Sequence, residues 1–252
     1  MSRICLKNVD FHYHSVAFKE RSLKSLLARW LSRNKAPEKI HDIHALKRIT
    51  VEIQAGERVG LLGHNGSGKT TFLKMLAGLY PISGGERQVD GKIRALFDLS
   101  LGFEPEASGR ENILYRGLLL GMTPREMRAL EGAIVEFADL GEFIDYPIKT
   151  YSAGMLVRLA FAISTAVGGD LLLIDEVIAA GDASFMVKAK ARIRSLMERS
   201  EILILASHDF AALKAICQRG LVFHRGELVF DASIDESIAE YNRINGLTQA
   251  TS

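Results

Sequence analysis

The chain has little of several residue types that mark specialised classes of protein. Its 252 residues include only two cysteines, one tryptophan and five prolines, which excludes a disulfide-stapled scaffold and a proline-rich linker. No apolar run approaches the roughly 20 residues of a membrane-spanning helix, and no secretory signal is evident at the N-terminus. A net charge of +2, with 48% apolar and 25% charged residues, indicates a globular protein. We expect Cys5 and Cys217 to be reduced and buried.

Apolar runs bounded by turn residues predict an alternation of strands and helices. The expected strands are 3–11, 49–53, 59–62, 171–174 and 202–206, and the expected helices are 70–77, 110–120, 124–139, 153–167, 183–200 and 210–217. Residues 220–230 form a predicted hairpin around His224–Glu227, followed by a polar helix. This order predicts an α/β fold with a mainly parallel central sheet.

A glycine-rich stretch after the run 59–62 fits the pattern G-x-x-x-x-G-K-[ST]. Its residues are Gly63, His64, Asn65, Gly66, Ser67, Gly68, Lys69 and Thr70. Glycines let successive backbone N–H groups turn toward phosphate oxygens, and the following helix adds the positive end of its dipole. A chance glycine-rich turn would match the four fixed positions in roughly one chain of this length per hundred. We therefore predict a nucleotide-binding loop, with Lys69 on the β- and γ-phosphates, Thr70 on Mg²⁺ and Thr71 as a further binding residue at the start of the helix.

Two adjacent acids follow the buried strand 171–174. Ligands of open α/β sheets bind at the carboxyl ends of the strands, which is where Asp175 and Glu176 lie. Acids at strand ends are often only helix caps or solvated loop residues. Beside a phosphate-binding loop, we expect Asp175 to help hold Mg²⁺ and Glu176 to polarise the attacking water.

Two further segments complete a recognisable set. Tyr151–Met155 precedes the acid pair, and Ser207-His208-Asp209 follows the next apolar strand. With the loop and the acids, their order and spacing resemble the ATP-binding subunit of ATP-binding cassette (ABC) transporters over almost the whole chain. The resemblance implies one ABC ATPase domain over residues 1–252. Its parts would be a P-loop NTPase (RecA-like) core, an antiparallel β subdomain and a helical signature subdomain at about 108–165.

The resemblance also assigns roles to residues. Ser152, Ala153 and Gly154 would contact the γ-phosphate of an ATP held by a second copy, in a head-to-tail homodimer. His208 would sense the γ-phosphate and position the water together with Glu176. Asp182 would take the place of the D-loop aspartate. Tyr13 is the candidate for stacking on adenine, with His44 as a rival nearer the second strand.

Departures from the common family pattern point to one subgroup. An aromatic residue opens the signature segment and Gly-Met closes it, as in exporters of bacterial polysaccharides. The runs 101–103, 109–112 and 176–183 are similar to that subgroup as well. No glutamine occurs between Ile93 and Asn112, so the residue that replaces the Q-loop glutamine is open, with Asp98 and Ser100 the nearest polar substitutes.

Residues 19–39 stand out as a basic insertion. They hold seven basic and two acidic residues, a net of +5, which leaves the rest of the chain slightly acidic. One helical face gathers Leu23, Leu26, Leu27, Trp30 and Leu31. This pattern fits either a helix that packs on the core or a basic amphipathic helix that meets a membrane surface or a partner. The resemblance favours the second alternative, in which the basic amphipathic helix faces a permease or its substrate.

The resemblance favours an exporter of lipid-linked polysaccharide, O-antigen in particular, that works on the cytoplasmic face of the inner membrane with separate polytopic permease subunits. Capsule and teichoic acid exporters stay open. The alternative from another class is a soluble mechanical or regulatory ABC ATPase, although we expect no nucleic-acid partner. We also expect no C-terminal carbohydrate-binding domain, because the chain stops shortly after its last predicted helix.

Neutralising Lys24, Arg29 and Arg33 should impair export and spare the ATPase activity of the isolated subunit, because the basic face would act on a membrane or partner rather than on ATP. Surface glycan in cells and phosphate release in vitro measure the two effects. Unaltered export would refute this role of the insertion.

Overall fold

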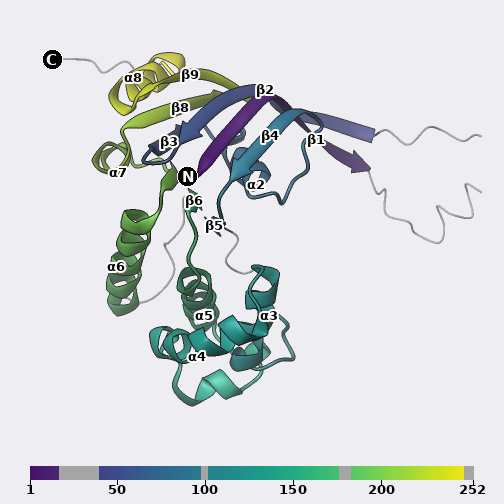
Figure 1. Cartoon of the computed structure of the whole chain (residues 1–252), viewed down its shortest axis with the longest axis vertical. Coiled ribbons are helices and arrows are strands. Elements are labelled where there is room, and N and C mark those ends of the chain that lie inside the picture. The colour runs from purple at the N-terminus through teal and green to yellow at the C-terminus, as the bar shows by residue number, and fades with distance from the viewer. Residues whose placement is uncertain (17–39, 98–101, 176–182, 247–252) are drawn as a thin grey trace, which may run out of the picture.

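Two β-sheets, helices that cover the larger sheet and a separate group of helices make up the described part of the chain (Figure 1). This computed structural model describes residues 1–16, 40–97, 102–175 and 183–246. The predicted inserted helix at 19–39 lies outside these ranges. None of the helices in the described ranges has the length and apolar character needed to cross a bilayer.

The larger sheet has six strands in the order β5-β6-β7-β3-β8-β9. These are β5 (Ile93–Leu96), β6 (Leu171–Asp175), β7 (Ile202–Ala206), β3 (Arg58–Leu62), β8 (Arg219–His224) and β9 (Glu227–Ser233). All neighbours are parallel except the hairpin β8–β9. The prediction of an α/β fold with a mainly parallel central sheet is confirmed.

Both faces of this sheet are covered, which explains why its central strands read as unbroken apolar runs. On one face, Leu172, Leu203 and Leu205 pack with side chains of α6 (Ala183–Arg199), α7 (Phe210–Ile216) and α8 (Ile234–Ile244). On the other face, Leu171, Leu173 and Ile204 pack against α2 (Lys69–Leu76) and the second sheet.

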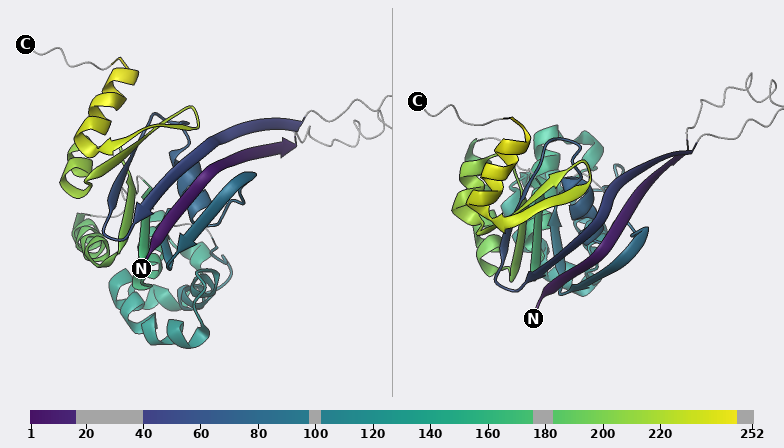
Figure 2. Two further views of the ribbon diagram at one scale, coloured as in Figure 1. Left: turned by 45° about the horizontal axis from the view of Figure 1, so that its top comes forward. Right: turned by 90° about the horizontal axis from the view of Figure 1, so that it is seen from above.

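The second sheet is antiparallel, with strand order β2-β1-β4. Its strands are β2 (Ile40–Gln54), β1 (Arg3–Val16) and β4 (Gly84–Asp90), and the first two curve away from the core (Figure 2). Both are longer than the ranges 49–53 and 3–11 predicted from their apolar residues. Sequence reasoning did not find β4 or β5, because β4 is mostly polar and exposed and β5 has only four residues.

A separate group of helices follows β5 in the chain, at the bottom of Figure 1. It contains α3 (Gly109–Leu119), α4 (Pro124–Ala138) and α5 (Ala153–Ala166), with short 3-10 turns at Gly141–Asp145 and Ile148–Thr150. Its buried residues, among them Ile113, Ile134 and Leu159, form their own apolar cluster. Capping boxes at Ser108–Glu111 and Thr123–Glu126 start α3 and α4, since each pair satisfies N–H groups at the helix start.

The two cysteines differ in their surroundings. Cys217 is buried in the apolar cluster that also holds Leu62 and Ile234, and burial raises the pKa of its thiol to about 12, so the thiol stays protonated at physiological pH. The expectation that both are buried is wrong for Cys5, which is half-buried on β1. Both are free thiols.

Two glycines inside helices offer a matched test of how α3 packs on α4. A Cβ on Gly117 would lie 2.2 Å from Met127 Cγ, whereas one on Gly132 would meet nothing within 4 Å. Gly132→Ala should stabilise the protein by about 0.5–1 kcal/mol through helix propensity. Gly117→Ala should destabilise it by about 1–2 kcal/mol, because overpacking outweighs the same propensity gain. Urea unfolding measures both, and equal stability of the two variants would contradict the close contact.

Candidate functional site

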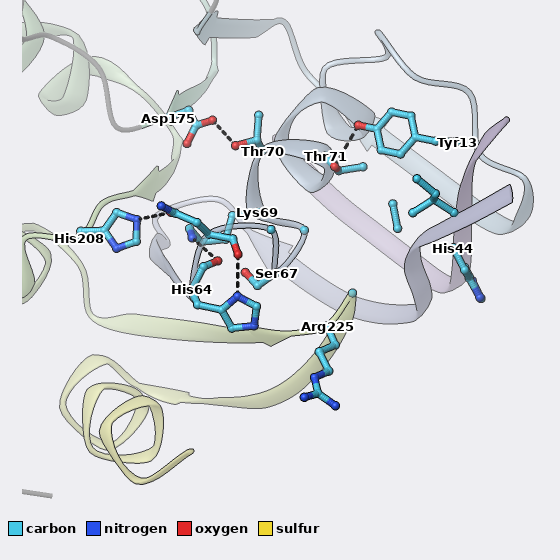
Figure 3. Close-up of a pocket in the computed structure, with 16 residues that line it drawn as sticks. Tyr13, His44, His64, Ser67, Lys69, Thr70, Thr71, Asp175, His208 and Arg225 are labelled. Atoms are coloured by element: carbon cyan, nitrogen blue, oxygen red, sulfur yellow. Dashed lines mark hydrogen bonds between the residues drawn. The ribbon is translucent and has the colours of Figure 1, made fainter. Parts of the chain in front are cut away.

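Three strands of the larger sheet end side by side at one cavity. In the sheet order, β7 lies between β6 and β3, and all three run parallel. The glycine-rich loop follows β3, Asp175 ends β6, and His208 follows β7. The cavity between them has a volume of about 710 Å³ and extends to β1 and β2 (Figure 3).

The glycine-rich loop turns tightly before α2 begins at Lys69. Gly63 has a φ of 153°, and a Cβ there would lie 2.4 Å from Ser67 Oγ and 2.6 Å from the Phe223 carbonyl oxygen. Only glycine fits here, because Ser67 and the Phe223 carbonyl leave no room for a side chain. The Lys69 ammonium is buried and donates to the carbonyls of Gly63 and His64, so it lies inside the curl of the loop.

Thr70 and Asp175 meet across the cavity although they lie 105 residues apart. The Thr70 hydroxyl donates to Asp175 Oδ2 at 2.7 Å (Figure 3). A hydroxyl and a carboxylate oxygen at the mouth of a phosphate-binding loop are donors that Mg²⁺ prefers. The residues present therefore fit the ion.

His208 contacts the loop through Asn65. His208 Nε2 lies 3.2 Å from Asn65 Oδ1, and the ring donates when its proton is on Nε2. The next residue, Asp209, accepts from Ala211 N and Ala212 N at the start of α7, which holds the backbone beside the histidine. The side chain of His208 thus lies beside the loop, on the same side as Asp175 (Figure 3).

The end of the cavity away from Asp175 is largely apolar. Tyr13 on β1 is half-buried, its hydroxyl lies 3.1 Å from Thr71 Oγ1, and burial raises the pKa of its phenol. Its directly paired neighbour on β2 is Ile43, a residue that is 57% exposed. Ala45, two residues on, also lines the cavity. These side chains form an apolar wall of the kind that a nucleotide base can contact.

His44, the rival candidate, also lines the cavity, but its ring is engaged on the other face of the strand. It stacks on His12 at 4.0 Å between ring centroids, and its Nε2 lies 2.6 Å from Asp10 Oδ1. Burial pushes the pKa of Asp10 upward, but hydrogen bonds from Arg48 N and His44 outweigh it and hold that pKa below its ordinary value.

Sequence reasoning predicted the hairpin around His224–Glu227 but did not place its turn at the cavity, one side of which the turn closes. Arg225 and Gly226, the two residues between β8 and β9, have φ angles of 49° and 85°, as in a type I′ turn. Gly226 N donates to the Ser67 carbonyl at 2.9 Å, and Lys47 N donates to the Gly226 carbonyl at 2.8 Å. Ile43 and Ala45 were missed as well. No local pattern marks these residues, because only the packing of the two sheets brings them to the loop.

The predicted signature residues lie apart from this cavity. Ser152 caps α5, with its hydroxyl accepting from Met155 N at 3.2 Å, and Ser152, Ala153 and Gly154 are exposed and do not line the cavity. Tyr151 donates its hydroxyl to the Phe143 carbonyl at 2.6 Å and is half-buried. An exposed helix N-terminus thus faces outward with a hydroxyl and two small residues. Glu176, Asp182, Asp98 and Ser100 lie outside the described residues.

Comparison with known proteins identifies the family. The family model described as ABC transporter matches residues 46–179, which includes the loop and Asp175. The chain belongs to the ABC transporter family. It is an ATP-binding ATPase cassette of that family.

Among relatives of this cassette, the O-antigen export system ATP-binding protein RfbB of Myxococcus xanthus is 39% identical over 100% of the chain and 58% of its own length. RfbE of Yersinia enterocolitica, of the same description, is 38% identical over 93% of the chain and 99% of its length. The teichoic acids export ATP-binding protein TagH of Shouchella clausii is 38% identical over 82% of the chain and 57% of its length. The chain thus spans little more than half the length of two of these relatives.

Solved structures share the fold. The ATP-binding cassette MJ0796, in a dimeric post-hydrolysis state bound to ADP and Pi, has a TM-score of 0.65 and 22% identity over 92% of the chain and 98% of its own. An ATP-binding subunit of an ABC transporter has the same TM-score at 18% identity, over 98% and 95% of the two chains. The predicted cassette fold is therefore confirmed.

Two glycines with left-handed backbone offer a test of the hairpin turn. A Cβ on Gly226 would lie 2.6 Å from the Ala45 carbonyl oxygen, whereas one on Gly141, with a φ of 59°, would meet nothing within 4 Å. Both alanine variants bear the backbone cost of about 1–2 kcal/mol. Gly226→Ala should lose about 1–3 kcal/mol more in the free energy of unfolding, because it also crowds backbone. Equal losses in the free energy of unfolding, measured by urea titration, would mean that the turn does not pack closely against the backbone of β2.

Proposed function

We propose that this cassette is the ATP-hydrolysing subunit of an exporter of lipid-linked polysaccharide, with O-antigen as the preferred substrate. The observation that carries the proposal is the meeting of Lys69, Thr70, Asp175 and His208 at one cavity beside an apolar base wall. The choice of polysaccharide rests on the export functions of the relatives from Myxococcus and Yersinia and on the signature segment of the sequence. Teichoic acid export is the second candidate, because a relative of that description is as similar.

In the proposed complex, ATP lies with its base on Tyr13 and Ile43 and its phosphates in the loop. Loop N–H groups and Lys69 bind the β- and γ-phosphates, and Lys69 exchanges its present carbonyl partners for phosphate oxygens. Thr70 and Asp175 would hold Mg²⁺, which when bound neutralises phosphate charge. Gly63 and Gly68 keep the backbone close enough to the phosphates for these contacts.

Glu176 follows Asp175 directly and would orient and deprotonate the water for in-line attack on the γ-phosphate. His208 would donate a hydrogen bond toward the γ-phosphate, with its ring oriented by Asn65. The attacking water forms a bond to phosphorus as the bond to the β–γ bridging oxygen breaks, which releases ADP and phosphate.

Two copies would assemble head to tail, so that Ser152, Ala153 and Gly154 of one face the γ-phosphate bound to the other, with Asp182 at the shared interface. The exposed start of α5 supports this arrangement, since a helix N-terminus attracts anions. Separate polytopic permease subunits would hold the dimer at the cytoplasmic face of the inner membrane. ATP-driven closing of the dimer would then move the permease through its cycle.

Glu176→Gln should lower hydrolysis by 10²–10⁴-fold, because the base is lost and the charge-free amide still fits the site. ATP binding and the closed dimer should persist. Lys69→Ala should lose ATP binding itself, and Arg125→Ala, on the exposed start of α4, should match the wild type. Single-turnover phosphate release and size-exclusion chromatography with ATP measure these effects. Hydrolysis by Glu176→Gln near the wild-type rate would refute the assignment.

Export is tested in cells that lack the gene. Loss of surface polysaccharide with accumulation of its lipid-linked form inside, rescued by the wild type but not by Lys69→Ala, supports the proposal. The chemistry of the accumulated glycan separates O-antigen from teichoic acid. Purification without any polytopic membrane protein, and unchanged surface glycan, would favour a soluble ABC ATPase instead.

A further inference from the structure

Arg225 is the second strong cation at the nucleotide cavity. Of the lining residues in the described part of the chain, Lys69 and Arg225 alone carry a permanent positive charge. Lys69 is buried in the loop, whereas Arg225 is exposed at the tip of the β8–β9 hairpin (Figure 3). Figure 3 shows its side chain directed away from Lys69 and from the glycine-rich loop, so the guanidinium reaches a bound nucleotide only after a change of rotamer.

Nearby acids are engaged elsewhere. Glu227, which ends the same turn, lies 3.7 Å from Lys47 Nζ, and Asp175 accepts from Thr70. Within the described ranges, Arg225 makes no hydrogen bond or ion pair. The guanidinium of Arg225 carries five hydrogen-bond donors and lies at the cavity of the glycine-rich loop. It can therefore bind an anionic ligand that enters this cavity.

The backbone holds Arg225 in one place. Gly226, the next residue, is hydrogen-bonded to Ser67 and to Lys47, and the ring of His224 lies edge-on to His64 at 5.4 Å. Arg225 itself has a φ of 49°, a conformation that Asn and Gly adopt more readily than Arg.

The position of the β8–β9 turn indicates which part of a bound nucleotide would lie next to Arg225. Its contacts run from Ala45, at the apolar base wall, to Ser67, in the middle of the phosphate loop. A nucleotide with its base on that wall and its terminal phosphates at Lys69 and Thr70 crosses this interval with its ribose and α-phosphate. We propose that Arg225 binds the α-phosphate of the nucleotide, as a second cation that complements Lys69. This inference rests on nucleotide binding as proposed above.

The test uses the full-length protein and four ligands. Arg225→Asn removes the charge and retains a residue that suits the turn, Arg225→Lys retains a cation, and Arg125→Asn is a matched loss of an exposed arginine that does not line the cavity. Affinities for ATP, ADP, AMP and adenosine are measured by competition against a fluorescent ATP analogue.

Arg225→Asn should weaken the binding of ATP, ADP and AMP by a similar factor, on the order of fivefold at low salt. The affinity for adenosine should be unchanged, because adenosine has no phosphate. Arg225→Lys should recover part of the loss, and Arg125→Asn should match the wild type. The difference between wild type and Arg225→Asn should shrink toward 1 M salt, because the contact is exposed and screened.

Four results would overturn the inference. An equal loss for adenosine would mean that the variant distorts the cavity. A loss for ATP alone would place the guanidinium on the terminal phosphates. Unchanged affinities with weaker ATP-dependent dimerisation would assign Arg225 to a second copy of the chain. Lys69→Ala separates this inference from the proposed function: if Lys69→Ala loses ATP and Arg225→Asn does not, the nucleotide site stands and the role of Arg225 falls.

Discussion

The position of β7 between β6 and β3 is the constraint on which the site depends. Parallel strands that are neighbours end within about 5 Å of one another, so the phosphate loop, Asp175 and His208 arrive at the same edge of the sheet. The hydrogen bonds of Thr70 with Asp175 and of His208 with Asn65 join residues that lie 105 and 143 positions apart. Each strand is short, but burial on both faces fixes its register, and that register sets the side chains at its end.

A second constraint joins the two sheets. One end of the cavity belongs to β1 and β2, and the end with the glycine-rich loop belongs to the larger sheet. The β8–β9 turn joins the two ends, because Gly226 is hydrogen-bonded both to Lys47 of β2 and to Ser67 in the loop. A bound nucleotide would span the same junction. The relative placement of the sheets is thus part of the binding site, and not only a scaffold beneath it.

The sequence predicts those parts of the site that lie within one short segment. The loop from Gly63 to Thr70, Asp175 and His208 each follow a buried apolar strand, and that context made their positions predictable. Ile43 and Arg225 were not predictable, because strand pairing and sheet packing alone bring them to the cavity. The sequence left Tyr13 and His44 open as base-stacking candidates, because the side of the sheet on which each residue lies depends on the register of β1 and β2. Strand β4 was not predicted, because its residues are mostly polar and exposed and no apolar pattern marks it.

The start of α5 stands exposed and apart from the cavity of its own chain. Under the proposed assembly, one molecule therefore carries two unmatched halves of an active site. The number of complete sites then follows mass action, so the hydrolytic activity per molecule rises with the concentration of the subunits. A permease that holds two copies side by side would raise their local concentration and act as an activator of hydrolysis before any substrate is moved. A subunit released into dilute solution would consume little ATP.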